Sequence, residues 1–190
     1  MKKGKLLIFS APSGSGKTTL VNYLREEIPS IAFSVSATTR EPRGTEQNGV
    51  EYYFMSLEEF KKRVGNNEFL EWEEVYPGRC YGTLKAVVEK MREEGHHVAF
   101  DVDVVGGTNV KKFYGDDALS IFIQAPSIEV LRERLVGRQT DSMEEIEKRL
   151  AKADWEMNFA QGKFDITIIN NDLETAKRDS LEAVQNFIEK

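Results

Sequence analysis

The chain has 190 residues, 40% of them hydrophobic and 31% charged, which fits one globular domain with a sizeable core. Its 26 lysines and arginines against 32 aspartates and glutamates give a net charge of −6, so we expect neither a protein that wraps nucleic acid nor one that lies on an anionic membrane. The single cysteine, Cys80, excludes an intrachain disulfide and fits a reducing compartment. The apolar run before Pro12 is too short for a signal-peptide core or a membrane span, so we expect a cytoplasmic protein.

Short apolar, β-branched runs alternate with helical patterns along the chain. The runs predict strands at 5–10, 97–104, 119–125 and 164–170. The helical patterns predict helices at 17–28, 84–94, 128–135, 143–161 and 173–188. Ser142 with Glu145 predicts a capping box before the longest of these helices. The alternation predicts an α/β fold, a parallel sheet with helices on both faces.

Residues 31–83 have a different sequence pattern, with short strand-like runs around one predicted helix at 57–64. Ser56 and Glu59 predict a second capping box at the start of that helix. We interpret this segment as an inserted, mostly antiparallel subdomain.

The stretch from Ala11 to Thr18, APSGSGKT, follows the first predicted strand and matches G-x-x-x-x-G-K-[ST] except that alanine stands first. Its glycines allow successive backbone N–H groups to face a phosphate, the following helix adds its positive end, and Lys17 adds a full charge. The Thr18 hydroxyl can bind Mg²⁺. A plain glycine turn is the alternative, but strand, loop and helix all fall where phosphate binding needs them. The motif therefore predicts a magnesium nucleoside triphosphate as ligand.

A second informative stretch is SVSATTREPRGTEQNGVEYYF, residues 34–54. Arg40 and Arg43 lie three apart in a turn, and two arginine forks suggest a site for a dianionic phosphate, although a solvated surface pair would look similar. Tyr52 and Tyr81 offer phenolic donors, and Glu71 is an acid set among apolar residues.

At these residues the chain resembles the guanylate kinases, which transfer the terminal phosphoryl group of ATP to GMP. The stretches that carry the resemblance are APSGSGKTT, SVSATTREPRGTEQNGVEYYF, FLEWEEVYPGRCYGT, DVDVVGG, RLVGRQTDSMEEIEKRL and NNDL, in the family's order across residues 4–190. The resemblance implies a P-loop nucleoside monophosphate kinase fold with a five-stranded parallel sheet. It further implies a core of residues 1–30, 85–133 and 150–190, an inserted mixed α/β GMP-binding subdomain at 31–84, and a helical lid at 134–149.

The resemblance also implies roles for individual residues. On the ATP side they are Ala11, Pro12, Ser13, Gly14, Ser15, Gly16, Lys17, Thr18 and Thr19, with Arg134 and Asn171 near the base. The GMP phosphate is assigned to Arg40, Arg43, Tyr52 and Tyr81, the guanine to Ser36, Glu71 and Thr83, and the nucleoside to Asp101. The catalytic residues implied are Lys17, Arg40, Arg43, Arg138 and Arg149, and Mg²⁺ is assigned to Thr18 and, through water, Asp103.

Several of these assignments keep an alternative. Asp101 and Asp103 end a predicted strand, where either acid could merely cap a loop, and strand alternation argues against both meeting one ligand. Asn171 could belong to an ordinary turn. The loop YPGRCYG is a residue longer than the family's usual one, and Val105 stands where the family often carries glutamine.

Two other functions fit parts of the pattern. A kinase for a sugar phosphate would leave Glu71 and Ser36 without a guanine to read, and a non-catalytic scaffold module would lack an intact phosphate loop, whereas this chain keeps Lys17 and Thr18. We therefore expect an enzyme with ATP and GMP as partners, without nucleic acid or membrane, as a monomer or homodimer. We also expect His96 and His97 at a surface or strand edge, Cys80 as a semi-exposed thiol, and Trp155, Met157 and Phe159 in the core.

Overall fold

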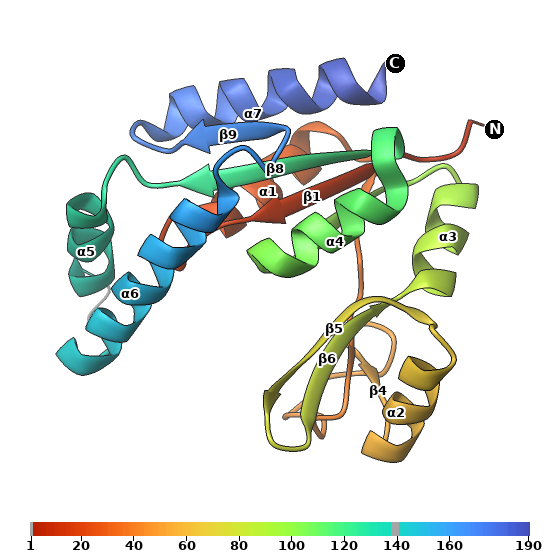
Figure 1. Cartoon of the computed structure of the whole chain (residues 1–190). Coiled ribbons are helices and arrows are strands. Elements are labelled where there is room, and N and C mark those ends of the chain that lie inside the picture. The colour runs from red at the N-terminus through yellow and green to blue at the C-terminus, as the bar shows by residue number, and fades with distance from the viewer. Residues whose placement is uncertain (1, 138–140) are drawn as a thin grey trace. The chain divides into compact units, whose positions relative to one another are not determined.

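The computed structural model describes residues 2–137 and 141–190 (Figure 1). The chain divides into two compact units. Unit 1 consists of the segment ending at Lys5 together with Ala32–Val98, and unit 2 consists of Leu6–Ile31 and Ala99–Lys190. The division passes through strands β2 (Ile31–Phe33) and β7 (His97–Asp101).

A five-stranded sheet has the strand order β2-β7-β1-β8-β9, with β1 at Leu6–Ser10, β8 at Ala118–Gln124 and β9 at Ile166–Ile169. The pairs β1–β8 and β8–β9 are parallel, and every residue of β1 is buried. A continuous buried run of this kind is typical of a parallel strand covered on both faces. The predicted α/β fold with a five-stranded parallel sheet is confirmed.

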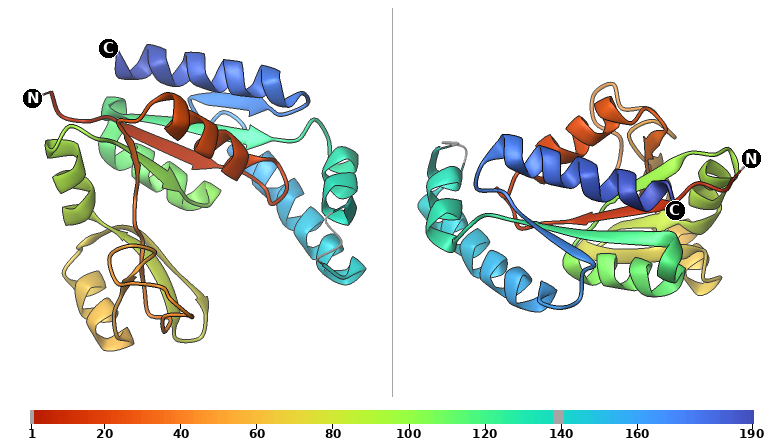
Figure 2. Two further views of the ribbon diagram at one scale, coloured as in Figure 1. Left: turned by 180° about the vertical axis from the view of Figure 1, so that it is seen from behind. Right: turned by 90° about the horizontal axis from the view of Figure 1, so that it is seen from above.

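Helices cover both faces of the sheet within unit 2 (Figures 1 and 2). On one face α1 (Lys17–Glu27) packs beside α7 (Leu173–Ile188), and on the other α4 (Val104–Tyr114) packs beside α6 (Met143–Ala160). Another helix of this unit, α5 (Ile128–Gly137), packs against α6 through a buried apolar cluster. A short 3₁₀ turn, Gly115–Asp117, precedes β8.

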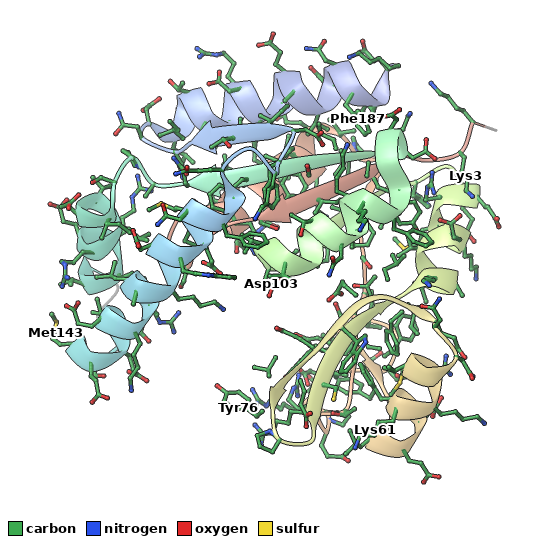
Figure 3. The ribbon with its side chains drawn as sticks, in the orientation of Figure 1. Lys3, Lys61, Tyr76, Asp103, Met143 and Phe187 are labelled. Atoms are coloured by element: carbon green, nitrogen blue, oxygen red, sulfur yellow. The ribbon has the colours of Figure 1, made fainter. Side chains whose placement is uncertain are left out.

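Unit 1 contains a four-stranded sheet in the order β4-β3-β6-β5. Its strands are β3 (Ala37–Thr38), β4 (Tyr53–Phe54), β5 (Phe69–Tyr76) and β6 (Arg79–Leu84), and its helices are α2 (Leu57–Gly65) and α3 (Lys85–Glu93). The β3–β6 and β5–β6 pairs are antiparallel, as expected, whereas β3–β4 is parallel. Figure 3 labels Tyr76 at the exposed end of β5.

Cys80 lies in the apolar core of unit 1, together with Phe60 and Phe69. Only 3% of the residue is exposed, so the expectation of a semi-exposed thiol was wrong. Burial raises the pKa of the Cys80 thiol, with Glu74 adding a like-charge contribution. A buried thiol with a raised pKa is a packing residue rather than a reactive one.

The two predicted capping boxes differ. At α6 both halves are present, because Ser142 accepts from the Glu145 N–H and Glu145 accepts from the Ser142 N–H. At α2 the Ser56 hydroxyl accepts from the Glu59 N–H at 3.1 Å, but the Glu59 carboxylate accepts from Arg63 instead. The second box is therefore only half formed.

Two other expectations from the sequence were wrong in part. The strand predicted over 97–104 ends at Asp101, because α4 begins at Val104. Trp155 is 50% exposed on α6 and is not a core residue, whereas Met157 and Phe159 are half-buried against an apolar cluster as expected.

The imidazole of His97 is tied into unit 1, where its Nδ1 accepts a hydrogen bond from the Lys5 N–H at 3.1 Å. Burial lowers the pKa of His97 from its usual value, and the positive charges of Lys2, His96 and Lys5 lower it further. The unfolded chain consequently binds more protons at this residue than the folded chain does around the unfolded pKa of 6.5. Stability from this source is present above that pH and is lost as the pH falls from it through the lower pKa of the folded state.

We expect His97→Asn, which keeps an acceptor near the position of Nδ1, to weaken the loss of stability between pH 7.5 and 5.5. The free energy of unfolding in urea at the two pH values measures the effect. His96→Asn is the control for loss of an imidazole and should keep more of the wild-type pH dependence than His97→Asn does. Equal pH dependence in both variants would contradict this role for His97.

Candidate functional site

The predicted phosphate loop connects the end of β1 to the start of α1. Gly14 and Gly16 both have φ of 93°, in the left-handed region that favours glycine. Ala11 does not have a positive φ, so the alanine at the motif's first position costs no backbone strain. The buried Ser10 hydroxyl donates towards the carbonyls of Val102 and Asp103 at 2.9 and 3.0 Å, which ties the end of β1 to the segment before α4.

Asn170 holds the phosphate loop from the far end of the chain. Its Nδ2 donates to the carbonyl of Ser15 at 2.9 Å, and both residues are buried. A Cβ at Gly16 would lie 2.3 Å from the same Nδ2, so only glycine fits there without a shift. The Asn170 carbonyl in turn accepts from the Arg134 guanidinium at 2.7 Å. The turn after β9 thus fixes both the loop and a side chain of α5.

A hollow of about 450 Å³ opens beside this loop, and we call it the phosphate-loop hollow. Its lining comes from the loop, the end of β7 and α6: Ala11, Pro12, Ser13, Gly14, Gly16, Lys17, Thr18, Thr19, Asp101, Val102, Asp103, Arg149, Lys152 and Glu156. The structure therefore brings together most of the predicted ATP-side residues with both aspartates. Lys17 forms an ion pair with Asp101.

Asp103 is the N-cap of α4, where its Oδ1 accepts from the Gly106 N–H at 2.6 Å (Figure 3). Asp101 and Asp103 nevertheless both line the phosphate-loop hollow. The alternation argument against a shared location does not apply, because β7 ends at Asp101 and Asp103 lies beyond it. Capping uses one oxygen of Asp103, so the predicted water-mediated role remains compatible with the cap.

The predicted lid residues differ in whether they reach the phosphate loop. Arg149 on α6 reaches the loop, donating to the Ser13 hydroxyl at 2.8 Å and to Asp141 at 3.3 Å. Arg134 contacts the Asn170 carbonyl and is not among the residues that line the phosphate-loop hollow. Arg138 lies outside the described residues. Asn171 is exposed in the turn before α7, where its N–H donates to the Ile169 carbonyl, and its assignment to the ATP base stays a prediction.

In unit 1, Arg40 is the centre of the predicted phosphate-binding group. Its two terminal nitrogens donate to the two carboxylate oxygens of Glu46 at 2.9 Å each, a bidentate pair. The guanidinium carbon lies 5.2 Å from the ring centre of Tyr52, whose ring is 6.0 Å from that of Tyr81. The pKa of Arg40 is raised, first by Glu46 and, against the opposing effect of desolvation, also by Tyr81. The same pairing lowers the pKa of Glu46.

Arg43 is exposed, and its backbone N–H donates to Glu46 at 2.7 Å, so one carboxylate organises both arginine positions. Arg40 and Arg43 also line a shallow hollow of about 460 Å³ together with Arg79 at the β5–β6 turn. The structure thus brings the two predicted arginines and two tyrosines into one neighbourhood.

The predicted guanine readers lie on the same sheet. Glu71 on β5 is opposite Thr83 on β6, and the Thr83 hydroxyl donates to the Glu71 Oε1 at 2.6 Å. Ser36 is half-buried next to β3, and its carbonyl accepts from the Tyr53 N–H at 2.9 Å. Glu71 and Thr83 are therefore a preformed pair, as a shared role requires.

Sequence reasoning missed four residues of these neighbourhoods, namely Glu46, Asn170, Lys152 and Glu156. Glu46 carried a weak signal, since an acid three residues after Arg43 in a turn can reach both arginines. Lys152 and Glu156 follow Arg149 at helical spacing and could have been found as its neighbours on one face. Asn170 contacts the loop across 155 residues of sequence and gave no local signal.

The residues around the phosphate loop suit Mg²⁺. The Thr18 hydroxyl and the carboxylates of Asp101 and Asp103 are hard oxygen donors on one hollow, the ligand type that Mg²⁺ prefers. No cluster of three or more His, Cys, Asp or Glu side chains that could cage a metal occurs in residues 2–137 and 141–190. Mg²⁺ commonly keeps several waters and takes other oxygens from substrate phosphates, so a dedicated cage is not needed. Among the helices in the described ranges, none is long and apolar enough to cross a membrane.

A glycine-rich loop between a buried parallel strand and a helix, with a lysine and a threonine at that helix's start, defines an α/β phosphate-binding protein of the P-loop class. A model of the family described as guanylate kinase matches residues 3–190. The chain therefore belongs to the guanylate kinase family, as the sequence motifs predicted.

Individual relatives agree with this assignment. The chain is 61% identical to a guanylate kinase of Bacteroides thetaiotaomicron, covering 98% of this chain and 91% of that one. It is 52% identical to a guanylate kinase of Porphyromonas gingivalis, covering 98% and 99%. Among solved structures, the guanylate kinase from Anaplasma phagocytophilum matches with a TM-score of 0.72 at 31% identity, covering 100% of this chain and 89% of that one.

We expect Asn170→Ala to destabilise the protein, because the buried Ser15 carbonyl would lose its donor at a cost of about 1–3 kcal/mol. Asn171→Ala is the matched control, being an exposed neighbour of the same type. Unfolding in urea measures both variants. If the two variants lose the same free energy of unfolding, Asn170 does not hold the loop.

Proposed function

We propose that this protein transfers the terminal phosphoryl group of ATP to GMP, giving ADP and GDP in a Mg²⁺-dependent reaction. The observation that carries the proposal is the convergence of Lys17 and Arg149 on one hollow with the phosphate loop. Membership of the guanylate kinase family supports the same reaction.

On the donor side, the backbone of the loop from Ala11 to Gly16 binds the phosphates, and Lys17 follows the transferring group with its charge. Thr18 and, through water, Asp103 would hold Mg²⁺, which when bound neutralises negative charge on the phosphates. Thr19 at the start of α1 adds to the lining. Arg134 and Asn171 stay assigned to the side of the adenine.

Acceptance of the phosphoryl group needs no strong base, because the attacking atom is already a phosphate oxygen of GMP. Catalysis then consists of alignment and charge neutralisation. Arg40 and Arg43 bind the acceptor phosphate with Tyr52 and Tyr81. The bidentate pair with Glu46 supports this role, since it holds the Arg40 fork in one orientation next to the Tyr52 ring.

The base of the acceptor is read by Glu71, Thr83 and Ser36, with Asp101 near the nucleoside. Guanine presents a ring N–H and an exocyclic NH₂ side by side, and one carboxylate can accept from both. The hydrogen bond from Thr83 to Oε1 supports this assignment because it fixes the orientation of the Glu71 carboxylate.

Residues 134–149 act as a lid in this proposal, bringing Arg138 and Arg149 to the transferring phosphoryl group. Movable arginines suit a reaction that spreads negative charge over the moving group. The contact of Arg149 with Ser13 supports its part, since the guanidinium already reaches the loop.

We further propose that the protein works in the cytoplasm as a monomer or homodimer, with small molecules as its substrates. A net charge of −6 argues against nucleic acid as a partner.

Lys17→Met keeps the stem of the side chain and removes its charge. We expect turnover to fall at least about a hundredfold, as removal of an electrostatic donor to a transition state typically does. A coupled assay with ATP and each nucleoside monophosphate measures turnover, and circular dichroism checks that the fold is kept. More than about a tenth of wild-type activity in the folded variant would rule out this loop as the catalytic phosphate site.

Glu71→Gln tests how the base is read. Adenine offers a bare ring acceptor where guanine offers donors, and sites that read buried polar groups reject such analogues by roughly ten thousandfold or more. We expect the variant to lose more than about 1 kcal/mol of transition-state binding for GMP and to show a smaller preference for GMP over AMP.

The measurement is kcat/KM for GMP, IMP and AMP in both proteins. Glu58→Gln, an exposed acid on α2, is the control for loss of one charge in unit 1. An unchanged ratio of GMP to AMP in Glu71→Gln would show that the guanine is read elsewhere.

A further inference from the structure

The phosphate-loop hollow contains a cation that the motifs do not assign. Lys152 lies on α6 three residues after Arg149, about one helical turn further along, and both side chains line the hollow with Lys17. Arg149 already reaches the loop through its hydrogen bond to Ser13. A second cation on the same helical face is therefore placed next to the phosphates that the loop would bind.

Lys152 has an unusual partner. Glu156, one turn further along α6, lines the same hollow, and its side chain is only 7% exposed. Burial raises the pKa of Glu156, an effect that Lys152 and Lys17 oppose. A buried carboxylate is costly without a cation beside it. The nearby charges of Lys152 and Lys17 therefore help to explain how a carboxylate is tolerated at this position.

The geometry of this pair leaves the ammonium group available. The Lys152 Nζ lies 3.8 Å from the Glu156 Oε1, which is longer than a hydrogen bond. The lysine side chain is 67% exposed, and its flexible four-carbon stem lets the charge move while Glu156 keeps it close. Lys152 can thus turn to a phosphate without leaving a tight ion pair.

The charge balance of the hollow indicates why an additional movable cation is needed to bind a triphosphate. Its lining carries three basic side chains, Lys17, Arg149 and Lys152, and three acidic ones, Asp101, Asp103 and Glu156. The lining by itself is therefore close to neutral, and a triphosphate needs cations that can move towards it.

We propose that Lys152 is a binding residue for the phosphates of the nucleoside triphosphate, and that Glu156 is the positioning residue that holds it at the hollow. This inference rests on the proposed function, because it takes the phosphate-loop hollow as the donor site. It adds Lys152, a second cation on α6, to the phosphate-binding cations Lys17 and Arg149.

Lys152→Gln tests the binding role. We expect the dissociation constant for ATP, measured by calorimetry with and without Mg²⁺, to rise about tenfold, the size expected when a hydrogen bond to a charged group is lost. Lys152→Arg should restore most of the affinity because it keeps the charge. The difference should shrink in high salt, since charge attraction is screened.

Lys148→Gln is the matched control. Lys148 stands one turn earlier on α6, is 72% exposed, pairs with Glu144 and is not among the residues lining the hollow. It should bind ATP like the wild type. If Lys152→Gln binds ATP as tightly as Lys148→Gln does, the inference is wrong.

Glu156→Gln tests the positioning role separately. We expect weaker ATP binding than in the wild type, and little further loss when Lys152→Gln is added, because both changes remove the same interaction. Additive losses would contradict positioning through Lys152. Unchanged ATP binding with only a change in the free energy of unfolding would reduce Glu156 to a structural residue.

These outcomes are distinguishable from failure of the proposed function. If wild-type protein phosphorylates GMP and Lys17→Met does not, the proposed function stands whatever Lys152 does. If Lys152→Gln binds ATP weakly but wild-type protein transfers no phosphoryl group to GMP, the nucleotide site stands and the proposed reaction fails.

Discussion

The hydrogen bond from the Asn170 side chain to the Ser15 carbonyl is the constraint on which the shape of the phosphate loop depends. It places an amide against the phosphate loop so closely that residue 16 has no room for a Cβ. The left-handed φ of Gly16 adds a second reason for glycine there. Asn170 directly follows β9, an edge strand of the sheet, and its carbonyl also accepts a hydrogen bond from Arg134 on α5. The shape of the loop is therefore fixed by contacts with packed secondary structure and not by the loop alone. Binding groups held in advance lose less entropy when a ligand arrives.

Around this fixed loop, charge is arranged in pairs. Lys17 is paired with Asp101, Arg149 with Asp141 and Lys152 with Glu156. Within unit 1, Arg40 is paired with Glu46 in the same way. Clustered cations would repel one another, and each carboxylate offsets that repulsion while it limits where its partner can point. A phosphate group offers three oxygens to the same donors, so it can share or replace a carboxylate on an arginine fork. The pairing thus keeps the cations close to their predicted phosphate ligands without creating a net positive patch. This arrangement agrees with the net negative charge of the whole chain.

How far the sequence could predict this arrangement depends on the range of each interaction. The loop from Ala11 to Thr18 was readable because strand, glycines and helix are consecutive. The Glu71–Thr83 pair needed the family resemblance, since the pairing of β5 with β6 sets the two residues opposite each other. Asp103 was placed on a strand because the apolar run continues to Val104, but the aspartate caps α4 and ends that run. The exposure of Trp155 contradicts the prediction that this large apolar side chain lies in the core, because size and hydrophobicity alone do not determine burial.

The acids at the phosphate-loop hollow differ in what they can give to a ligand, and that difference follows from their local contacts. One carboxylate oxygen of Asp103 accepts a hydrogen bond at the N-terminus of α4, so the carboxylate is oriented and its other oxygen is left for a ligand. Asp101 forms an ion pair with Lys17, the residue that we propose also serves the transferring phosphoryl group. Glu156 is buried and forms a long ion pair with Lys152. Carboxylates in these three situations cannot be interchangeable, because each holds a different partner in place: a helix end, the loop lysine and the α6 lysine. The chemistry proposed for the hollow therefore depends on which group each acid holds, rather than on the number of acids present.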